Sequence, residues 1–265
     1  MVARAIPPKA IFNLKLLTLA RDLKRRKARE KHELFVAEGV RAVEELLRSP
    51  LSIKGALIAP QLMEAPRGAA LADSLRSRGV HVEDVAANEF GSAAETESPQ
   101  GVIAVAEVPH RSFDDLSDGW KGVLLLLDAV QDPGNVGAIV RTSAALGAVA
   151  TITLPGTVDL WNAKVVRSGM GAHFHHPAFS STWAEVDTFL ERSGTKLFAA
   201  DAAGEAASLV RPPERVALVV GNEGAGLSSE TRARADRTIA LPINPAVESL
   251  NVAVATGILL YLLGR

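Results

Sequence analysis

The feature that most restricts the fold is a run of apolar residues near the middle of the chain. Gly122-Val-Leu-Leu-Leu-Leu-Asp128 has no polar side chain between its ends. Such a strand is typical of the centre of a parallel sheet covered by helices on both faces. Further strands are predicted over 149–154, 196–200, 215–220 and 238–241, and helices over 135–146, 161–170, 183–192, from 228, and over 251–263. This alternation predicts an α/β fold with a parallel sheet.

The first 108 residues also alternate between helices and strands. Helices are predicted over 13–29, 39–47 and 68–78, and strands over 34–37, 53–59, 80–85 and 101–108. Residues 109–121 are polar and rich in turn-forming residues, which is typical of a linker. We therefore expect a smaller N-terminal α/β domain over 1–108, a linker over 109–121 and a second domain over 122–265.

The composition excludes several kinds of site. The chain has no cysteine, which excludes disulfides, thiolate metal sites and cysteine nucleophiles and is compatible with the cytoplasm, the location we expect. No signal peptide is found, and the apolar run 252–263 is too short to span a bilayer, so no membrane partner is expected. His173, His175 and His176 have no cysteine or acidic cluster beside them. We expect them to pack or to line a surface near RNA, and we expect no metal.

Basic residues are concentrated near the N-terminus. Residues 9–31 carry a net charge of +7, although the whole chain carries −1. Lys24, Arg25, Arg26 and Lys27 are expected to surround their helix without acidic partners at the next turn. A localised cationic surface favours contact with a polyanion, and here RNA binding and an ordinary solvated helix face are about equally supported.

Three segments that follow predicted strands combine glycine or proline with hydrogen-bonding side chains. These segments are 128–141, 221–227 and 241–257. In parallel sheets, ligands gather at the carboxyl ends of strands. Glu248, Ser249 and Asn251 stand between a stiff loop and an apolar helix, where polar groups are costly unless they bind something. The glycine spacing is not that of a dinucleotide-binding or phosphate-binding loop, and each segment alone is explained by turn glycines.

Taken together and in this order, the segments closely resemble the three motifs of the SpoU (TrmH) family of RNA 2′-O-ribose methyltransferases, within the SPOUT superfamily. The matching stretches are Asp132-Pro-Gly-Asn-Val-Gly-Ala-Ile-Val-Arg141, Val220-Gly-Asn-Glu-Gly-Ala-Gly-Leu227 and Leu241-Pro-Ile-Asn-Pro-Ala-Val-Glu-Ser-Leu-Asn-Val-Ala-Val-Ala255. Residues 165–174 resemble the family's intermediate segment. Residues 35–41 and 98–104 resemble its appended substrate-binding domain, which is similar to a ribosomal RNA-binding protein.

The resemblance implies a catalytic domain with a deep trefoil knot, formed where the C-terminal segment threads through a loop. Family members bind S-adenosyl-L-methionine in that knot, largely through backbone groups. The implied cofactor-binding positions are Gly221, Glu223, Gly224, Leu241, Ile243, Ser249 and Leu250. Family members also dimerise through the knotted domain, so a homodimer that buries helix 251–263 is expected, with ordinary core packing of that helix as the alternative.

The implied reaction is attack of a ribose 2′-hydroxyl on the sulfonium methyl. The hydroxyl needs orientation, loss of its proton and stabilisation of the developing negative charge. The implied catalytic residues are Asn135, Arg141, Glu223, Ser249 and Asn251. A guanidinium is effectively always charged, so our hypothesis is that Arg141 binds the phosphate beside the target ribose and stabilises the alkoxide. The asparagines and Ser249 would orient the hydroxyl and loops, and Glu223 would hold the knot loop or assist with the proton.

The substrate class is open to several interpretations at this point. Ribosomal RNA is preferred over transfer RNA, because the N-terminal domain resembles the one attached to members that act on ribosomal RNA. The alternatives are a transfer-RNA 2′-O-methyltransferase, a base methyltransferase with the same knot, and a non-catalytic RNA-binding or ribosome-assembly protein. An antibiotic-resistance methyltransferase has a similar architecture, so the role is open between housekeeping and resistance. The Asn135 and Arg141 pair favours ribose over base, and the intact set of catalytic residues favours an enzyme.

Overall fold

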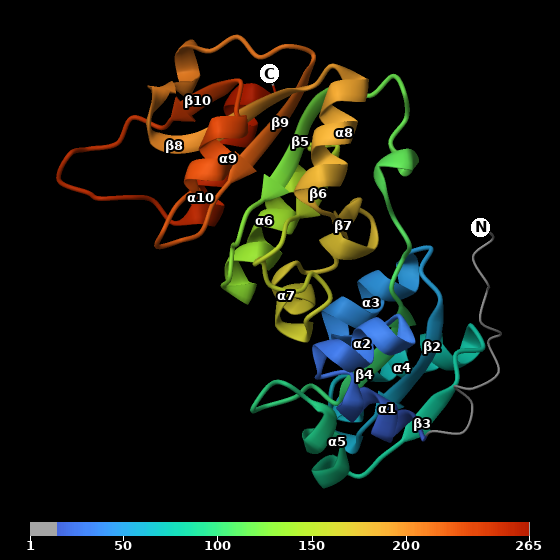
Figure 1. The fold of residues 1–265 in the computed structure, drawn as a ribbon. Coiled ribbons are helices and arrows are strands. Elements are labelled where there is room, and N and C mark those ends of the chain that lie inside the picture. The colour runs from blue at the N-terminus through green and yellow to red at the C-terminus, as the bar shows by residue number, and fades with distance from the viewer. Residues whose placement is uncertain (1–14, 265) are drawn as a thin grey trace. The chain divides into compact units, whose positions relative to one another are not determined.

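A computed structural model of the chain describes residues 15–264. Backbone contacts divide the chain between Val108 and Pro109 into two compact units, and each unit is described by itself below (Figure 1). Lys9 and the start of the helix predicted from residue 13 lie outside the described residues.

The first unit is built on a mixed four-stranded sheet in the order β1-β4-β2-β3. Its strands are β1 (Leu34–Glu38), β2 (Ile53–Ile58), β3 (Val82–Asp84) and β4 (Val102–Glu107). β4 pairs antiparallel with β1 and β2, whereas β2 and β3 are parallel. The helices are α1 (Leu16–Asp22), α2 (Arg26–His32), α3 (Val40–Arg48), α4 (Pro66–Ser77) and α5 (Ala87–Ala93), with a 3-10 turn over Pro60–Glu64. The sequence did not predict α5, whose Phe90 packs in one core cluster with the leucines of α1.

The prediction of one helix over 13–29 is wrong, because the chain breaks between α1 and α2. Leu23 is buried at this break, at 2% exposure. The break leaves backbone carbonyl groups without helical partners, and the buried Arg29 satisfies them: its guanidinium donates to the carbonyl oxygens of Leu23 at 2.7 Å and Lys24 at 2.9 Å. A buried arginine therefore stabilises a turn where the pattern of leucines indicated a continuous helix.

The second unit contains the predicted parallel sheet, with six strands in the order β10-β8-β9-β5-β6-β7. The strands are β5 (Gly122–Leu127), β6 (Ala150–Thr153), β7 (Ala178–Ser180), β8 (Lys196–Ala206), β9 (Arg215–Val220) and β10 (Arg237–Ala240). Every pairing in this sheet is parallel. The helices are α6 (Pro133–Ala145), α7 (Ala163–Ser168), α8 (Trp183–Ser193), α9 (Ser229–Arg234) and α10 (Val252–Leu263), with 3-10 turns over Phe113–Asp115, Ala172–Phe174 and Ala207–Leu209. The sequence missed β7, and β8 is longer than the predicted strand over 196–200.

β5 lies in the middle of the sheet, as its sequence predicted. Leu124 and Leu126 share a core cluster with Val186 and Phe189 of α8. Leu125 and Leu127 point to the opposite face, because side chains alternate along a strand, and they are equally buried at 0% exposure. Both faces of the sheet are therefore covered, which explains why this strand tolerates no polar residue.

The segment 109–121, predicted as a linker, packs on the second unit. Phe113 stacks on Phe189 with ring centroids 4.4 Å apart, and Trp120 is buried beside the same ring. Lys121 pairs with Glu214 at 2.7 Å. The polar composition of this segment reflects its exposed side, while its two aromatic rings attach it to α8.

Candidate active site

The loops after β5 and β9 meet at the point where the strand order of the second sheet reverses. From β5 the chain passes through α6 to β6, on one side of β5. From β9 it passes through α9 to β10, on the other side. In open parallel sheets this arrangement leaves a crevice at the carboxyl ends of the two adjacent strands, where ligands bind. The strand order therefore brings the first two sequence motifs to one place.

Glu223 connects these two loops. Its carboxylate accepts hydrogen bonds from the backbone N–H of Gln131 at 3.2 Å, from that of Asp132 at 3.0 Å and from Asn135 Nδ2 at 3.1 Å. Burial raises the pKa of Glu223, but the hydrogen bonds from Asn135 and the backbone outweigh it and hold the pKa below its usual range. Glu223 is therefore a carboxylate at neutral pH whose lone pairs are already engaged.

Asn135 links the same loops to the start of the last helix. Asp132 caps α6, accepting from the backbone N–H of Asn135 at 2.8 Å. Asn135 Oδ1 accepts from Asn251 Nδ2 at 2.9 Å, and Asn251 Oδ1 caps α10 through the backbone N–H groups of Ala253 and Val254. The structure thus joins Glu223, Asn135 and Asn251, one residue from each motif, in a single chain of hydrogen bonds.

Gly221 is at a position that only glycine fits. A Cβ atom at Gly221 would lie 2.5 Å from the backbone of Gly226. The loop closes tightly there, because the backbone groups of Asn222 and Gly226 bond to each other at 3.1 and 2.9 Å. Gly224 is exposed at the tip of the same loop. Close approach of backbone to backbone within the loop explains the glycine at position 221, which is not among the glycines with positive φ.

Arg141 extends from α6 toward the turn that follows α7. Gly137, one turn earlier on α6, lies against α7 so closely that a Cβ atom would be 2.5 Å from the carbonyl oxygen of Val165. Arg141 is exposed, and its guanidinium donates to Met170 Sδ at 2.8 Å. Met170 has a left-handed backbone, with φ of 48°. No carboxylate pairs with Arg141 among the described residues, so its charge is available to an anion.

The third motif is only partly brought to this site. Residues 242–250 form an exposed segment between β10 and α10, drawn as the long red loop in Figure 1. Leu241 is half-buried, whereas Ile243, Ser249 and Leu250 are exposed. The Ser249 hydroxyl, the one hydrogen-bonding side chain among these four, makes no hydrogen bond to the loops after β5 and β9 within residues 15–264. Asn251, directly after them, is the residue of this motif that the structure joins to Asn135.

The sequence comparisons agree with this geometry. The profile of the SpoU rRNA methylase family matches residues 122–261, which include all three motifs. The chain belongs to the SpoU rRNA methylase family. A second profile, the MRM3-like substrate binding domain, matches residues 17–104 of the first unit.

Known methyltransferases resemble this chain over 69% to 95% of its length. It is 35% identical to the 23S rRNA (guanosine(2553)-2′-O)-methyltransferase RlmP of Bacillus subtilis, over 91% of this chain and 92% of that protein. It is 35% identical to the 23S rRNA (adenosine(1067)-2′-O)-methyltransferase of Streptomyces laurentii, over 69% of each chain. The fold is similar to that of the SpoU methyltransferase AviRb from Streptomyces viridochromogenes, whose structure was solved in complex with the cofactor AdoMet. The TM-score is 0.84 and the sequence identity is 27%, over 95% of this chain and 97% of AviRb.

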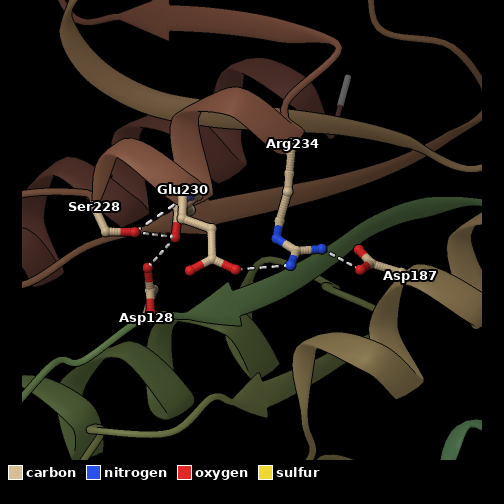
Figure 2. Close-up of polar contacts among 6 residues, drawn as sticks. Asp128, Asp187, Ser228, Glu230 and Arg234 are labelled. Carbon is tan, nitrogen blue, oxygen red and sulfur yellow. Dashed lines mark hydrogen bonds and ion pairs between the residues drawn. The ribbon is translucent and has the colours of Figure 1, made fainter.

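The helix after the second SpoU motif is anchored on two sides (Figure 2). Thr231 of α9 donates from its hydroxyl to Asp128 Oδ2 at the end of β5, at 2.5 Å, and Ser228 caps the helix. Arg234 pairs with Glu230 at 2.9 Å and with Asp187 of α8 (Figure 2). The loop 221–227 is consequently held between the fixed strand β9 and the fixed helix α9.

The prediction that the N-terminal cationic cluster lacks acidic partners is wrong. Arg25 pairs with Asp22 at 2.6 Å, and Arg26 pairs with Glu30 at 2.7 Å, one turn along α2. Lys24 Nζ donates to the carbonyl oxygen of Ala94 at 2.7 Å. All four cationic side chains are exposed, including Lys27. Asp22 and Glu30, which the net charge of +7 already includes, are thus paired with two of the four cationic side chains.

The three histidines have different environments. His173 and His176 are buried and His175 is exposed. Burial lowers the pKa of His173 to about 4, with nearby His176 adding to the effect. Burial and nearby Arg111 lower the pKa of His176 to about 4, and its Nε2 lies 2.9 Å from the Thr151 hydroxyl. No group of His, Asp and Glu side chains suited to a metal is found within residues 15–264.

Three further residues shape the loops of this site, although the sequence does not mark them as site residues. Asn222 and Met170 lie within the motifs and Ala129 lies within the segment 128–141, but their sequence pattern assigns no role to any of the three. Asn222 had one available signal, because its amide directly follows a predicted strand and precedes a glycine-rich turn, where asparagine side chains bond to backbone. The left-handed backbone of Ala129 and Met170 has no signal in the sequence, because both residue types favour other conformations.

Proposed function

We propose that this chain is an S-adenosyl-L-methionine-dependent methyltransferase that modifies a ribose 2′-hydroxyl of 23S ribosomal RNA. The hydrogen-bonded chain Glu223–Asn135–Asn251 carries the proposal, because it assembles one residue of each SpoU motif where the strand order reverses. The named activities of RlmP and of the Streptomyces laurentii enzyme support 23S rRNA as the substrate. Those two proteins modify different nucleotides, and this chain is 35% identical to each of them. Sequence identity therefore does not indicate which nucleotide this chain would modify.

In the proposed reaction, the 2′-oxygen attacks the methyl carbon of the sulfonium. The new O–CH₃ bond forms as the S–CH₃ bond breaks, the sulfur leaves as a neutral thioether, and the hydroxyl proton is released. Arg141 binds the phosphate next to the target ribose and stabilises the negative charge that develops on the oxygen. The absence of a carboxylate partner for Arg141 among the described residues, and its permanent positive charge, support this role.

Asn135 and Asn251 orient the hydroxyl and the loops in this proposal, together with Ser249. Glu223 acts as an anchor of the loop after β9. Its lowered pKa makes it a weak proton acceptor, and three donors already bind its carboxylate. These observations favour the anchoring role of Glu223 over a role in removing the proton.

The methyl donor is proposed to bind at the carboxyl ends of β9 and β10. The proposed pocket comprises Gly221, Glu223, Gly224, Leu241, Ile243, Ser249 and Leu250. Glycine permits close contact with an adenine or ribose, and Leu241, Ile243 and Leu250 supply aliphatic walls. The AdoMet complex of the similar AviRb supports this cofactor. The deep trefoil knot remains part of the proposal, with segment 241–250 as the part of the chain that would be threaded.

The first unit is proposed to bind the RNA. Its match to a substrate-binding domain supports this assignment, and so does the exposure of Lys24, Arg25, Arg26 and Lys27. Because Arg25 and Arg26 are ion-paired, they would have to exchange carboxylates for phosphates. Lys27 is therefore expected to contribute the largest share of the salt-dependent affinity among these four.

A homodimer through the second unit is also proposed. Val254, Ile258 and Tyr261 of α10 are 52%, 41% and 53% exposed and lie on one side of the helix at positions i, i+4 and i+7. Large apolar side chains in such a row are typical of a surface that another chain covers. No helix within residues 15–264 is long and apolar enough to cross a membrane.

The test is to map 2′-O-methylation in total RNA from cells with and without the gene. We expect one modified nucleotide of 23S rRNA to be lost, and the purified protein with S-adenosyl-L-methionine to restore it on 23S rRNA from the deletion strain. A lost site in transfer RNA instead would identify the alternative substrate. If no site is lost and the protein methylates neither RNA, the methyltransferase proposal is rejected in favour of a binding protein.

A further inference from the structure

Asn222 makes hydrogen bonds with both ends of its side chain. Its Oδ1 accepts from the backbone N–H groups of Gly224 at 3.0 Å and Ala225 at 2.9 Å, within its own loop. Its Nδ2 donates to the carbonyl oxygen of Ala129 at 2.9 Å, in the loop after β5. One amide therefore closes the loop after β9 and ties it to the neighbouring loop.

Ala129 has an unfavourable backbone conformation. Its φ is 57°, in the left-handed region that residues with a Cβ atom rarely adopt. The turn begins where β5 ends, because the N–H of Asp128 still bonds to the carbonyl oxygen of Val220 at 2.9 Å. Gly156 lies beside the Ala129 Cβ, and a Cβ on Gly156 would approach it to 3.1 Å. A strained turn of this kind persists only when surrounding contacts hold it.

The turn at Ala129 determines where the next backbone groups point. The N–H groups of Gln131 and Asp132, two and three residues later, both donate to the carboxylate of Glu223. Asp132 then caps α6 at Asn135. If Ala129 relaxed to an ordinary conformation, these N–H groups would turn away from Glu223, and the contact between Glu223 and Asn135 would lose its support.

We propose that Asn222 is a positioning residue of the methyl-transfer site: by binding the Ala129 carbonyl it holds the left-handed turn that directs Gln131 and Asp132 to Glu223. This role deepens the proposed function and rests on it for its effect on the reaction. It acts through the backbone, so Asn222 need not touch the cofactor or the RNA.

The first experiment distinguishes the role of the Asn222 donor, Nδ2, from that of its acceptor, Oδ1. Asn222→Asp keeps an acceptor for Gly224 and Ala225 but removes the donor to Ala129. We expect kcat on 23S rRNA from the deletion strain to fall about tenfold, the order of one hydrogen bond, while KM for S-adenosyl-L-methionine stays within about threefold. Asn222→Ala removes both ends, and here KM for the cofactor is expected to rise as well.

The second experiment changes the strain of the turn directly, in variants that keep Asn222. Ala129→Asn introduces a residue that tolerates the left-handed region, and Ala129→Val introduces a β-branched residue that does not. Activity is expected to survive in the first and to fall about tenfold in the second. Adding Ala129→Gly to Asn222→Asp should restore part of the lost kcat, because glycine adopts the turn without strain.

Amide hydrogen exchange distinguishes failure of this inference from failure of the proposed function. Asn222→Asp should accelerate exchange at Gln131 and Asp132 whether or not the wild-type chain methylates RNA. An inactive wild type with accelerated exchange in the variant would reject the function and retain the positioning role. Unchanged exchange at both amides, unchanged kcat in Asn222→Asp, or equal activity of Ala129→Asn and Ala129→Val would each overturn the inference.

Discussion

Asn251 donates a side-chain hydrogen bond of 2.9 Å to Asn135, across 116 residues of sequence. Both residues stand at the first turn of a helix, α10 and α6, and Asn135 also donates to Glu223. The two helices therefore present their amides to one point at the carboxyl ends of the central strands. This contact makes the two asparagines a coupled unit.

Alanine substitutions should show this coupling in a double-mutant cycle. Asn135→Ala and Asn251→Ala are each expected to lower kcat about 100-fold, and the double variant should be little worse than either, because residues that act as a unit are not additive. Asn162→Ala is the matched control, since Asn162 also caps a helix, α7, but outside the site. It should cost only about 1 kcal/mol of stability. Fully additive losses would show that the two amides act independently.

Arg141→Ala should abolish most methyl transfer and leave cofactor binding intact. A loss of about 100- to 1000-fold in kcat is expected for removal of a group that stabilises developing charge. Arg141→Lys should recover little, because an ammonium cannot bind a phosphate with a planar pair of donors. Arg167→Ala, an exposed arginine on the neighbouring α7, is the control. Near-normal transfer by a folded Arg141→Ala variant would refute the role assigned to this residue.

The buried histidines should make the fold sensitive to acid. In the folded chain the pKa values of His173 and His176 are about 4, whereas an unfolded histidine titrates near pH 6.5. Between these values the unfolded chain binds protons that the folded chain does not. The unfolding free energy should therefore fall as the pH drops from about 6.5 to 4, by up to about 1.4 kcal/mol per pH unit for each histidine.

Urea unfolding at a series of pH values measures this effect. His173→Gln should make the dependence on pH shallower over that range, because it removes one of the two titrating groups. His175→Gln is the control, since His175 is exposed. The explanation fails if His173→Gln keeps the full wild-type slope.

The row of exposed apolar residues on α10 should be a dimer contact. The double variant Val254→Glu, Ile258→Glu is expected to sediment as a monomer at concentrations where the wild-type chain sediments as a dimer, because buried carboxylates would destabilise the contact. Met63→Glu changes an equally exposed apolar residue of the first unit, at 49% exposure, and should have no effect. A wild-type chain that is monomeric throughout, or a double variant that remains dimeric, would contradict the proposed contact.

Lys27 should contribute to RNA affinity through charge alone. Lys27→Ala is expected to reduce the slope of log K against log salt by about 0.7, the value for one phosphate contact on single-stranded RNA. Glu30→Gln removes the carboxylate paired with Arg26 and should tighten RNA binding at low salt. Filter binding at several salt concentrations measures both slopes. An unchanged slope in Lys27→Ala would place the RNA contact elsewhere on the chain.

The sequence alone determined the sheet and most of its elements. Uninterrupted apolar runs such as Gly122–Leu127 mark a strand that is buried on both faces, and this property is carried by the segment itself. The short strand β7, with three residues, and the helix α5, with seven, carry too few residues for a periodic pattern. The break between α1 and α2 was also missed, because it depends on the buried side chain of Arg29.

The sequence also determined which residues are candidates for the chemistry, since the three SpoU motifs contain Asn135, Arg141, Glu223 and Asn251 in order. Only the tertiary structure decided that Asn135, Glu223 and Asn251 bond to one another, because their meeting depends on β9 pairing with β5 and on α10 packing against α6. The strained turn at Ala129 and its contact with Asn222 were likewise decided by the tertiary structure alone. A residue's type and local pattern set what it can bind, whereas its partner is set by segments that lie far away along the chain.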